Sequence, residues 1–276
     1  MRGAMRIPFT KMHGLGNDFV VLDGRNGSLP AMSPPVAKAL ADRKTGIGCD
    51  QLIMLEPSDA ADFRMRIFNA DGGEVEACGN ASRAVALLHG QPARVETSGG
   101  VIALEPLDGG ARVDMGTPRF GWEDIPLAYA MDTASMPVSW ESLENPAAVN
   151  VGNPHVIFFV EDPYAVELDR LGPLIETDPL FPARVNVNVA SIADGAITLR
   201  VWERGVGLTR ACGTGACATA VAAIAHKGVT SPVTVHLPGG DLEIAWEQGG
   251  TILMTGPATT SFTGSFEWSD FAGDAT

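Results

Sequence analysis

Basic residues are scarce in this chain of 276 residues. It has 19 lysines and arginines against 33 acidic residues, which gives a formal net charge of −14. A field of this sign repels the phosphates of nucleic acids and the headgroups of anionic lipids. We therefore expect no nucleic-acid partner and no role at a membrane surface.

Long apolar runs are also missing, although 45% of the residues are hydrophobic. No stretch approaches the roughly 20 apolar residues that a membrane-spanning helix needs. The segment 1–14 places Arg2, Arg6 and Lys11 among isolated apolar residues, without the continuous apolar core of a signal peptide. The sequence predicts no membrane span and a cytoplasmic location.

Cysteine is rare, and the spacing of the cysteines matches no common metal-binding motif. The four cysteines stand at positions 49, 78, 212 and 217, with no C-x-x-C pair, and the five histidines are scattered. This count excludes a disulfide scaffold for a chain of this length, and the spacing argues against a structural zinc site. We expect no metal, and the question becomes which thiols pack and which react.

The chain repeats itself around two of these cysteines. At an offset of 134 positions the matched residues are Met65–Phe68 with Leu199–Trp202, Gly73 with Gly207, Ala77 with Ala211, Cys78 with Cys212, and Gly79 with Gly213. Upstream, Gly16 and Asn17 match Gly152 and Asn153 at an offset of 136, and paired glycines match downstream at 140. A collinear series that includes both cysteines predicts an internal duplication.

Both copies have the same predicted elements. Helices are predicted over 80–89 and 214–227, in Ala-rich stretches that end at Gly90 and Gly228. Runs of β-branched and aromatic residues predict strands at 19–22, 65–68, 101–104 and 113–115, and in the second copy at 156–160, 198–202, 233–237 and 252–254. We infer an α+β fold of two similar lobes, each a mostly β unit with a central helix.

The predicted lobe boundaries follow from where the repeated strands end. Residues 1–121 form the first lobe, which carries Cys78, and residues 122–260 form the second, which carries Cys212. The segment 261–276 follows the second copy, and we expect it to return to the first lobe.

Cys78 and Cys212 each stand immediately before a predicted helix. Free backbone N–H groups at a helix start stabilise a thiolate, whose unperturbed pKa is about 8.5. The same donors can hold a substrate carboxylate. Two such groups flanking one carbon could remove a proton from one face and return one to the other, so we interpret these cysteines as a paired acid and base.

Packing is the alternative explanation for any cysteine, because unpaired cysteine is often a small buried hydrophobe. The matched positions in a duplication argue against it for Cys78 and Cys212. Cys49 and Cys217 have no cysteine counterpart, and we interpret both as structural.

Eight motifs along nearly the whole chain resemble those of the diaminopimelate epimerase family. They are His13–Phe19 (HGLGNDF), Gly46–Gln51 (GIGCDQ), Phe68–Gly72 (FNADG), Ala77–Asn80 (ACGN), Gly152–His155 (GNPH), Arg184–Asn186 (RVN), Trp202–Gly205 (WERG) and Ala211–Gly215 (ACGTG). The chain departs from the family pattern at Ala81 and Ser82, beside the first cysteine. Asn188 is an extra amide to which the resemblance gives no role.

The resemblance implies a cofactor-free epimerase that interconverts LL- and meso-diaminopimelate in lysine and peptidoglycan precursor synthesis. It implies two mixed α/β lobes with pseudo-twofold symmetry, each a curved sheet around its helix, with the active site in the cleft between them, and a homodimer. Cys78 and Cys212 are then catalytic, and His155 and Glu203 tune the thiols or the amine. The implied substrate-binding residues are Asn17, Gln51, Asn69, Gly79, Asn80, Asn153, Asn186, Glu203, Arg204, Gly213 and Thr214.

Three other functions fit parts of the sequence. A proline racemase or hydroxyproline epimerase shares the two-cysteine logic, but Cys78-Gly79-Asn80 argues against it. A dinucleotide-binding oxidoreductase would use Gly213-x-Gly215, yet the first acid beyond Ala218 is Asp241 and regular βαβ alternation is missing. A non-catalytic thiol-containing binding module would show no exchange of a substrate α-proton.

Overall fold

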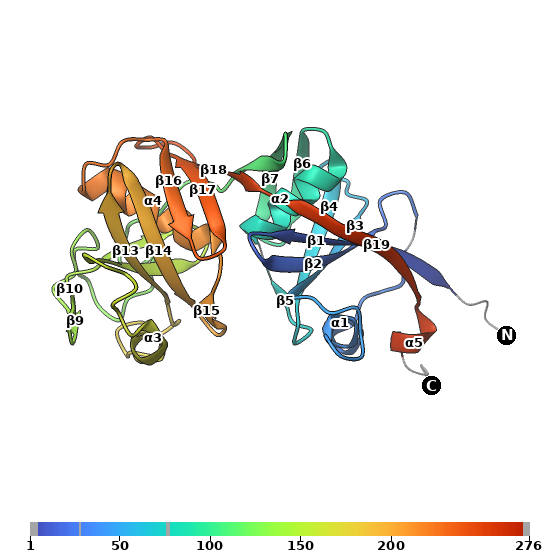
Figure 1. Ribbon diagram of the computed structural model, residues 1–276, viewed down its shortest axis with the longest axis horizontal. Helices are drawn as coiled ribbons and strands as arrows, with labels where there is room; N and C mark the ends of the chain where they lie inside the picture. The colour runs from blue at the N-terminus through green and yellow to red at the C-terminus, as the bar shows by residue number, and fades with distance from the viewer. Residues whose placement is uncertain (1–4, 28, 76–77, 273–276) are drawn as a thin grey trace. The chain divides into compact units, whose positions relative to one another are not determined.

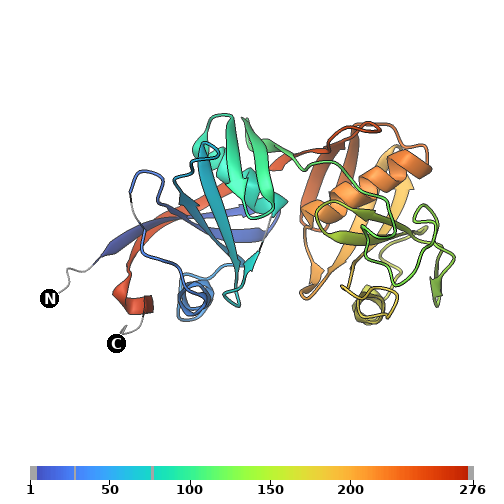
Figure 2. The same cartoon turned by 180° about the vertical axis from the view of Figure 1, so that it is seen from behind.

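A computed structural model describes residues 5–27, 29–75 and 78–272. The chain divides into two compact units. Unit 1 comprises Met1–Val113 and Pro257–Thr276, and unit 2 comprises Asp114–Gly256. Each unit is a curved β-sheet with one long central helix, as Figure 1 and the view from behind in Figure 2 show.

The first and last strands of unit 1 pair with each other. β1 (Arg6–Gly14) lies antiparallel between β2 (Asn17–Asp23) and β19 (Thr259–Glu267). The other elements of unit 1 are α1 (Pro34–Ala41), β3 (Gln51–Glu56), β4 (Phe63–Asn69), β5 (Glu74–Val75), α2 (Gly79–His89), β6 (Ala93–Thr97), β7 (Gly100–Leu107), β8 (Gly110–Asp114) and α5 (Ser269–Ala272).

Unit 2 repeats this order of elements. It consists of the small hairpin β9 (Ser139–Trp140) and β10 (Leu143–Glu144), then β11 (Ala147–Asn150), β12 (Pro154–Phe159), α3 (Leu168–Glu176), β13 (Asn186–Ala193), β14 (Ala196–Glu203), β15 (Gly207–Thr209), α4 (Gly213–His226), β16 (Val233–Leu237), β17 (Gly240–Ala245) and β18 (Leu253–Pro257).

The strand pairings confirm the duplication. In unit 1, β2 pairs parallel with β3, β3 antiparallel with β4, and β4 parallel with β6. In unit 2, β12 pairs parallel with β13, β13 antiparallel with β14, and β14 parallel with β16. The central helices α2 and α4 contact equivalent strands, β7 and β17 among them. The α+β fold predicted from the sequence is therefore correct.

Small residues allow the central helices to be buried within their sheets. Every residue of α4 from Gly215 to Ala223 is buried, and most of these residues are alanine. Gly90 and Gly228 adopt the left-handed conformation predicted for them, with φ of 74° and 72°. A second core in each unit lies under the shorter helix, α1 or α3, where a cluster of aliphatic side chains is buried.

The observed division differs from the sequence-based boundaries 1–121, 122–260 and 261–276. Residues 114–121 belong to unit 2, because Met115 donates to Ile252 O at 2.8 Å and Ile252 donates to Gly116 O at 2.9 Å. The return to unit 1 begins earlier, since Thr259 and Thr260 already pair with β1.

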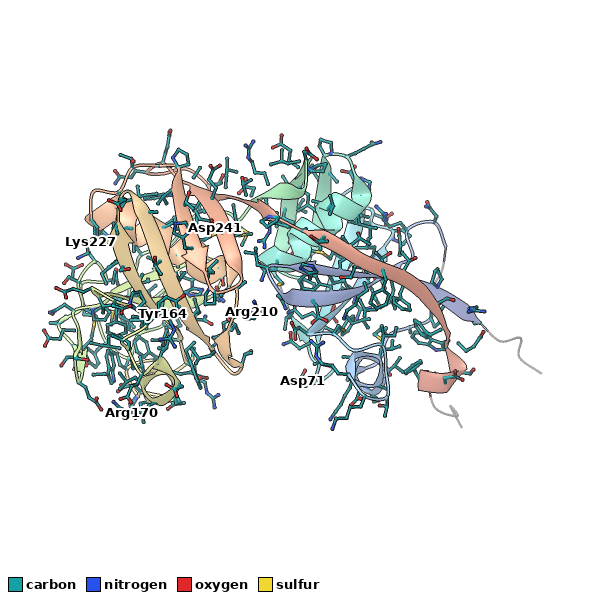
Figure 3. The ribbon with its side chains drawn as sticks, viewed as in Figure 1. Asp71, Tyr164, Arg170, Arg210, Lys227 and Asp241 are labelled. Carbon is teal, nitrogen blue, oxygen red and sulfur yellow. The ribbon has the colours of Figure 1, made fainter. Side chains whose placement is uncertain are left out.

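Charged side chains are exposed on the surface. Arg170 and Lys227 are exposed on unit 2, for example, and Figure 3 labels them among the side chains. Among the described residues, no helix is both long and apolar enough to span a membrane.

Candidate active site

Cys78 and Cys212 are the N-cap residues of the two central helices. Both have extended backbone, with φ of −148° and −124°, and the helices begin at Gly79 and Gly213. The first N–H groups of each helix lack partners within the helix and point towards its start. Each thiol therefore lies at the positive end of a helix, as the sequence predicts.

Asn17 is the polar partner of the first cysteine. The Cys78 Sγ lies 3.8 Å from Asn17 Oδ1, which also accepts a hydrogen bond of 3.2 Å from Asn80 Nδ2. Arg83 holds the other end of the Asn80 amide, because its Nη2 donates to Asn80 Oδ1 at 2.9 Å. Cys78 is half-buried, whereas Asn80 and Arg83 are buried.

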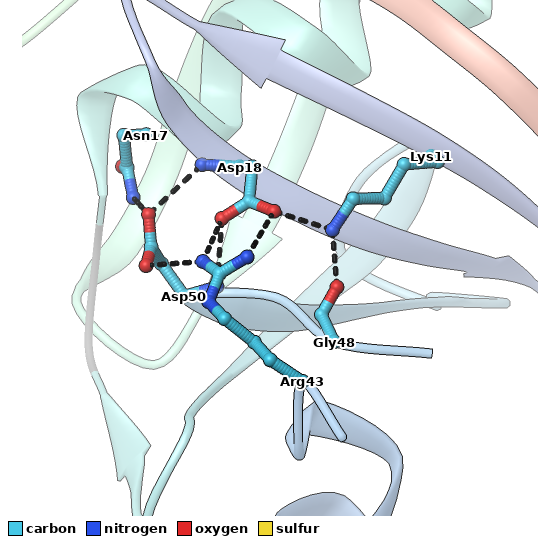
Figure 4. A network of polar contacts seen from close by, with 6 residues as sticks. All are labelled: Lys11, Asn17, Asp18, Arg43, Gly48 and Asp50. Atoms are coloured by element: carbon cyan, nitrogen blue, oxygen red, sulfur yellow. Dashed lines mark hydrogen bonds and ion pairs between the residues drawn. The ribbon is translucent and has the colours of Figure 1, made fainter. Parts of the chain in front are cut away.

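A network of charged groups lies behind Asn17 (Figure 4). Asn17 Nδ2 donates to Asp50 Oδ2 at 3.0 Å, and the backbone N–H of Asp18 donates to the same oxygen at 3.1 Å. Arg43 Nη2 bridges Asp50 Oδ1 and Asp18 Oδ1, at 2.8 and 2.5 Å. The Asn17 amide nitrogen is thereby turned towards Asp50, which leaves its oxygen for Cys78 and Asn80.

Asp18 is the centre of this network. Its carboxylate also accepts from Lys11, a buried lysine that donates in addition to the carbonyl of Gly48. Burial opposes ionisation of Asp18, but hydrogen bonds from Arg43 and Lys11 outweigh it and hold the pKa of Asp18 well below its usual range.

Gln51 and Asn69 form a second polar pair in unit 1. They are direct neighbours in the register of β3 and β4, and Gln51 Nε2 donates to Asn69 Oδ1 at 3.0 Å. Gln51 Oε1 is buried and has no hydrogen-bond partner among the described residues.

Cys212 is more deeply buried than Cys78, with 3% of its surface exposed. Its Sγ accepts from the Gly215 N–H at 3.4 Å and lies 3.5 Å from Thr214 Oγ1. Burial and the nearby charge of Glu203 raise the pKa of the Cys212 thiol well above its ordinary value, whereas the contacts with Thr214 and Gly215 lower it. These two donors are what the site supplies to hold a thiolate.

His155 and Asn153 lie beside Thr214. His155 Nε2 is 3.0 Å from Asn153 Oδ1, and Asn153 Nδ2 donates to Thr214 Oγ1 at 3.4 Å. His155 is fully buried, and this burial lowers its pKa to about 3, so the ring is neutral at physiological pH.

Asn186 and Glu203 are committed to contacts within unit 2. Asn186 Nδ2 donates to Pro154 O at 2.8 Å, and its Oδ1 accepts from the backbone N–H of Arg204 at 2.9 Å. The Glu203 carboxylate accepts from Thr209 Oγ1 at 2.6 Å. Asn186 thus fixes the turn that carries Arg204, whose guanidinium reaches the carbonyl of Ala183.

Each unit carries one set of the predicted residues. The first group, in unit 1, contains Asn17, Gln51, Asn69, Cys78, Gly79 and Asn80. Hydrogen bonds join Asn17 to Cys78 and Asn80, and Gln51 to Asn69 as a separate pair. The second group, in unit 2, contains Asn153, His155, Asn186, Glu203, Arg204, Cys212, Gly213 and Thr214. Cys49 and Cys217 are both buried, and burial raises the pKa of the Cys49 thiol to about 11. These facts fit packing roles for both.

Sequence reasoning missed the residues that orient the first group. Lys11, Asp18, Arg43 and Asp50 received no role, although Asp18 and Asp50 stand directly beside Asn17 and Gln51 in quoted motifs. Neighbouring acids in a motif that also contains a candidate ligand could have signalled such a network. Within the described ranges no cluster of three or more histidine, cysteine or acidic residues could hold a metal ion.

Sequence comparison with known proteins identifies a family for this chain. A family model described as diaminopimelate epimerase matches residues 9–121 and 147–261. Similar curated proteins named diaminopimelate epimerase include one from Erythrobacter litoralis, 71% identical over 97% of this chain and 100% of the relative, and one from Zymomonas mobilis, 53% identical over 97% and 100%.

Solved structures at low identity share the fold. A PhzF-family phenazine biosynthesis protein from Enterococcus faecalis has a TM-score of 0.71 at 14% identity and covers 95% of this chain and 99% of its own. A hydroxyproline epimerase from Agrobacterium vitis has a TM-score of 0.65 at 16% identity, with coverage of 97% and 94%.

Proposed function

The chain belongs to the diaminopimelate epimerase family, and from that premise we propose that Cys78 and Cys212 interconvert LL- and meso-diaminopimelate as a two-base pair. The chain is thus an isomerase of lysine biosynthesis, and the family match separates it from the proline racemase and oxidoreductase alternatives. The proposed reaction needs no cofactor. We also propose a cytoplasmic location and a homodimer.

One observation carries the assignment of the two cysteines. Both are N-cap residues of equivalent helices in a duplicated fold, and their positions match in the repeat. A packing role would not require cysteine at both positions. A paired acid and base requires two groups that can each transfer a proton, and a duplication can supply one from each unit.

The proposed step is a proton transfer across one carbon. The thiolate of one cysteine takes the α-proton, and the thiol of the other gives its proton to the opposite face of the carbanion. The substrate leaves inverted, and the thiol and thiolate have exchanged roles, so atoms and charge balance. For this chemistry the two units must close on one substrate, which is part of the proposal.

The helix starts would stabilise the charge that develops during the reaction. Backbone N–H groups at Gly79 and Asn80, and at Gly213 and Thr214, are the proposed donors to the reacting carboxylate. Donors that are already oriented stabilise an enolate-like state without reorganisation, and one such donor can contribute about 3 kcal/mol.

The remaining predicted residues suit a substrate with two amino-acid centres. Carboxamides of Asn17, Asn69 and Asn153 can both donate and accept, so they can bind ammonium and carboxylate groups alike. Glu203 and Arg204 carry the opposite charges that such a zwitterion needs.

Exchange in deuterated water tests the proposal. LL-diaminopimelate should acquire deuterium at its α-carbon and yield the meso isomer, whereas L-proline and L-glutamate should not react.

Cys78→Ala and Cys212→Ala should each abolish inversion, with a loss of more than about 10³-fold because a reacting group is removed. The matched control, Cys217→Ala in the same helix as Cys212, should retain activity. Inversion that persists in either catalytic variant would overturn the two-base assignment.

A further inference from the structure

Asn188 is a buried amide that the proposed chemistry does not use. It lies in β13, is fully buried, and its Oδ1 has no hydrogen-bond partner among the described residues. A buried acceptor without a partner destabilises the fold, so an aliphatic side chain would serve packing better. The reason for an asparagine at this position must therefore lie in the contacts of its NH₂ group.

The orientation of the Asn188 amide is determined by its two neighbours. Its Nδ2 lies 3.1 Å from Val156 O and 3.0 Å from His155 Nδ1. A backbone carbonyl can only accept, so the group that faces it must be the NH₂. The second hydrogen of this NH₂ is then directed at His155 Nδ1, which must be unprotonated.

This contact determines the tautomer of His155. The ring is neutral because burial lowers its pKa, and the charge of Arg204 lowers it further. A neutral imidazole whose Nδ1 accepts carries its hydrogen on Nε2. The 3.0 Å contact with Asn153 is therefore a hydrogen bond from His155 Nε2 to Asn153 Oδ1.

The tautomer in turn orients Asn153 and Thr214. With Oδ1 occupied by His155, Asn153 presents its Nδ2 to Thr214 Oγ1. The threonine oxygen accepts there, which leaves its hydroxyl hydrogen for the Cys212 Sγ, 3.5 Å away. With the other tautomer, Asn153 would present its oxygen, and the hydroxyl would donate to Asn153 in place of the sulfur.

Asn188 also packs against the second donor to Cys212. A Cβ on Gly215 would lie 2.8 Å from Asn188 Oδ1, a distance that side chains do not tolerate. Glycine at 215 is thus what lets Asn188 approach the first turn of α4, where the Gly215 N–H donates to the Cys212 Sγ.

We propose that Asn188 is a positioning residue that fixes the proton of His155 on Nε2 and, through Asn153 and Thr214, directs a hydroxyl donor at Cys212. The inference rests on the proposed function for its effect on catalysis. The arrangement of protons does not depend on that function and can be measured without substrate.

Nitrogen-15 spectra of protein labelled at histidine test the arrangement directly. The His155 signals, identified by their loss in His155→Gln, should show Nε2 protonated and Nδ1 unprotonated from about pH 5 to about pH 9. An ionised carboxylate can only accept, so where the new carboxyl of Asn188→Asp is ionised the Nδ1 of His155 should become protonated. A protonated Nδ1 in the natural protein, or an unprotonated Nδ1 beside the ionised carboxylate of folded Asn188→Asp, would overturn the proposal.

Kinetics of Asn188→Leu test the consequence. This variant keeps the branched shape of the side chain but not the donor, and kcat should fall about 10-fold, the effect of one misplaced hydrogen bond, with a smaller change in KM. Thr219→Val is the matched control, because Thr219 Oγ1 is also buried in α4 and has no hydrogen-bond partner in the part of the chain that the structure describes. Unchanged kcat in folded Asn188→Leu would overturn the proposal.

The two readouts separate the inference from the proposed function. If the natural protein has the expected tautomer but does not exchange the α-proton of diaminopimelate, the proposed function fails and the arrangement of protons stands. If it exchanges the proton with His155 protonated on Nδ1, the proposed function stands and the role of Asn188 fails. If Asn188→Leu does not fold, the spectra of the natural protein and of Asn188→Asp decide.

Discussion

At the scale of single residues, the two cysteines are held by different chemistry. The amide oxygen of Asn17 faces Cys78 and can only accept, whereas Cys212 has two donors, Thr214 and the Gly215 N–H, in addition to the acceptor Glu203. Each asparagine of the repeated Gly-Asn motif is oriented by its own neighbours, Asp50 for Asn17 and His155 for Asn153. The duplicated positions are thus equivalent, but their surroundings differ.

Asp50→Asn tests the orientation of Asn17. The variant keeps the size of the side chain but replaces one acceptor oxygen by a donor, so it can accept from Arg43 or from the Asn17 amide but not from both. We expect kcat/KM to fall about 10-fold, because a misoriented amide loses a contact of roughly 1 kcal/mol. Steady-state kinetics of the epimerisation would measure this.

The matched control is Asp241→Asn, because Asp241 is an exposed acid paired with His236 outside both groups. It should leave kcat/KM unchanged. An Asp50→Asn variant as active as this control would show that the orientation of Asn17 does not depend on the Asp50 carboxylate.

At the scale of elements, the sequence predicted what local pattern determines. The helix starts at Cys78 and Cys212 followed from a Cys-Gly step before an Ala-rich stretch, and the structure confirms both. The strand at 233–237 also agrees with β16. The predicted strands 113–115 and 252–254 were each wrong by one residue at one end. Met115 and Ile252 lie just outside β8 and β18, where backbone hydrogen bonds join Ile252 to Met115 and Gly116.

Elements defined by long-range contacts were not predicted. β1 has an irregular mixture of polar and apolar residues, and among the described strands its first part, 6–9, pairs only with β19, about 250 positions later in the chain. The network around Asp18 likewise joins β1, β2 and the segment 42–50, which no spacing rule places together. The motif resemblance identified the candidate substrate-binding residues, but only the three-dimensional structure shows which side chains orient them.

Helix α3 illustrates how an element supports the second group. Gly172 lies directly against Trp202, so a Cβ there would be 2.5 Å from the indole ring. Trp202 Nε1 also donates to Glu176 Oε2 at 2.7 Å. The close approach of helix and indole holds the end of β14, where Glu203 follows.

Gly172→Ala should therefore destabilise unit 2. Overpacking of this kind costs about 1–3 kcal/mol in the free energy of unfolding, and chemical denaturation would measure it. Leu174→Ala in the same helix is the control, since Leu174 is 56% exposed and its truncation should have little effect. Equal stability of the two variants would contradict the tight contact between α3 and Trp202.

At the scale of the whole molecule, the chain completes unit 1 only after it has built unit 2. It leaves unit 1 after Val113 and returns at Pro257. β19 then covers one edge of β1 along eight paired positions, from Arg6–Glu267 to His13–Thr259. Unit 2 needs no such return, because its strands are contiguous in sequence.

Truncation after Ala258 should consequently affect one unit. Without β19, the edge of β1 has unpaired N–H and C=O groups, and unit 1 loses a packed strand. We expect amide hydrogen exchange to accelerate in β1 and β2, whereas amides of β12 and β13 keep their protection. Truncation after Trp268 is the matched control, because it removes α5 but retains β19, and should leave β1 protected. Equal loss of protection in both units would mean that they unfold as one cooperative body, and unchanged protection of β1 would mean that β19 is not needed to complete unit 1.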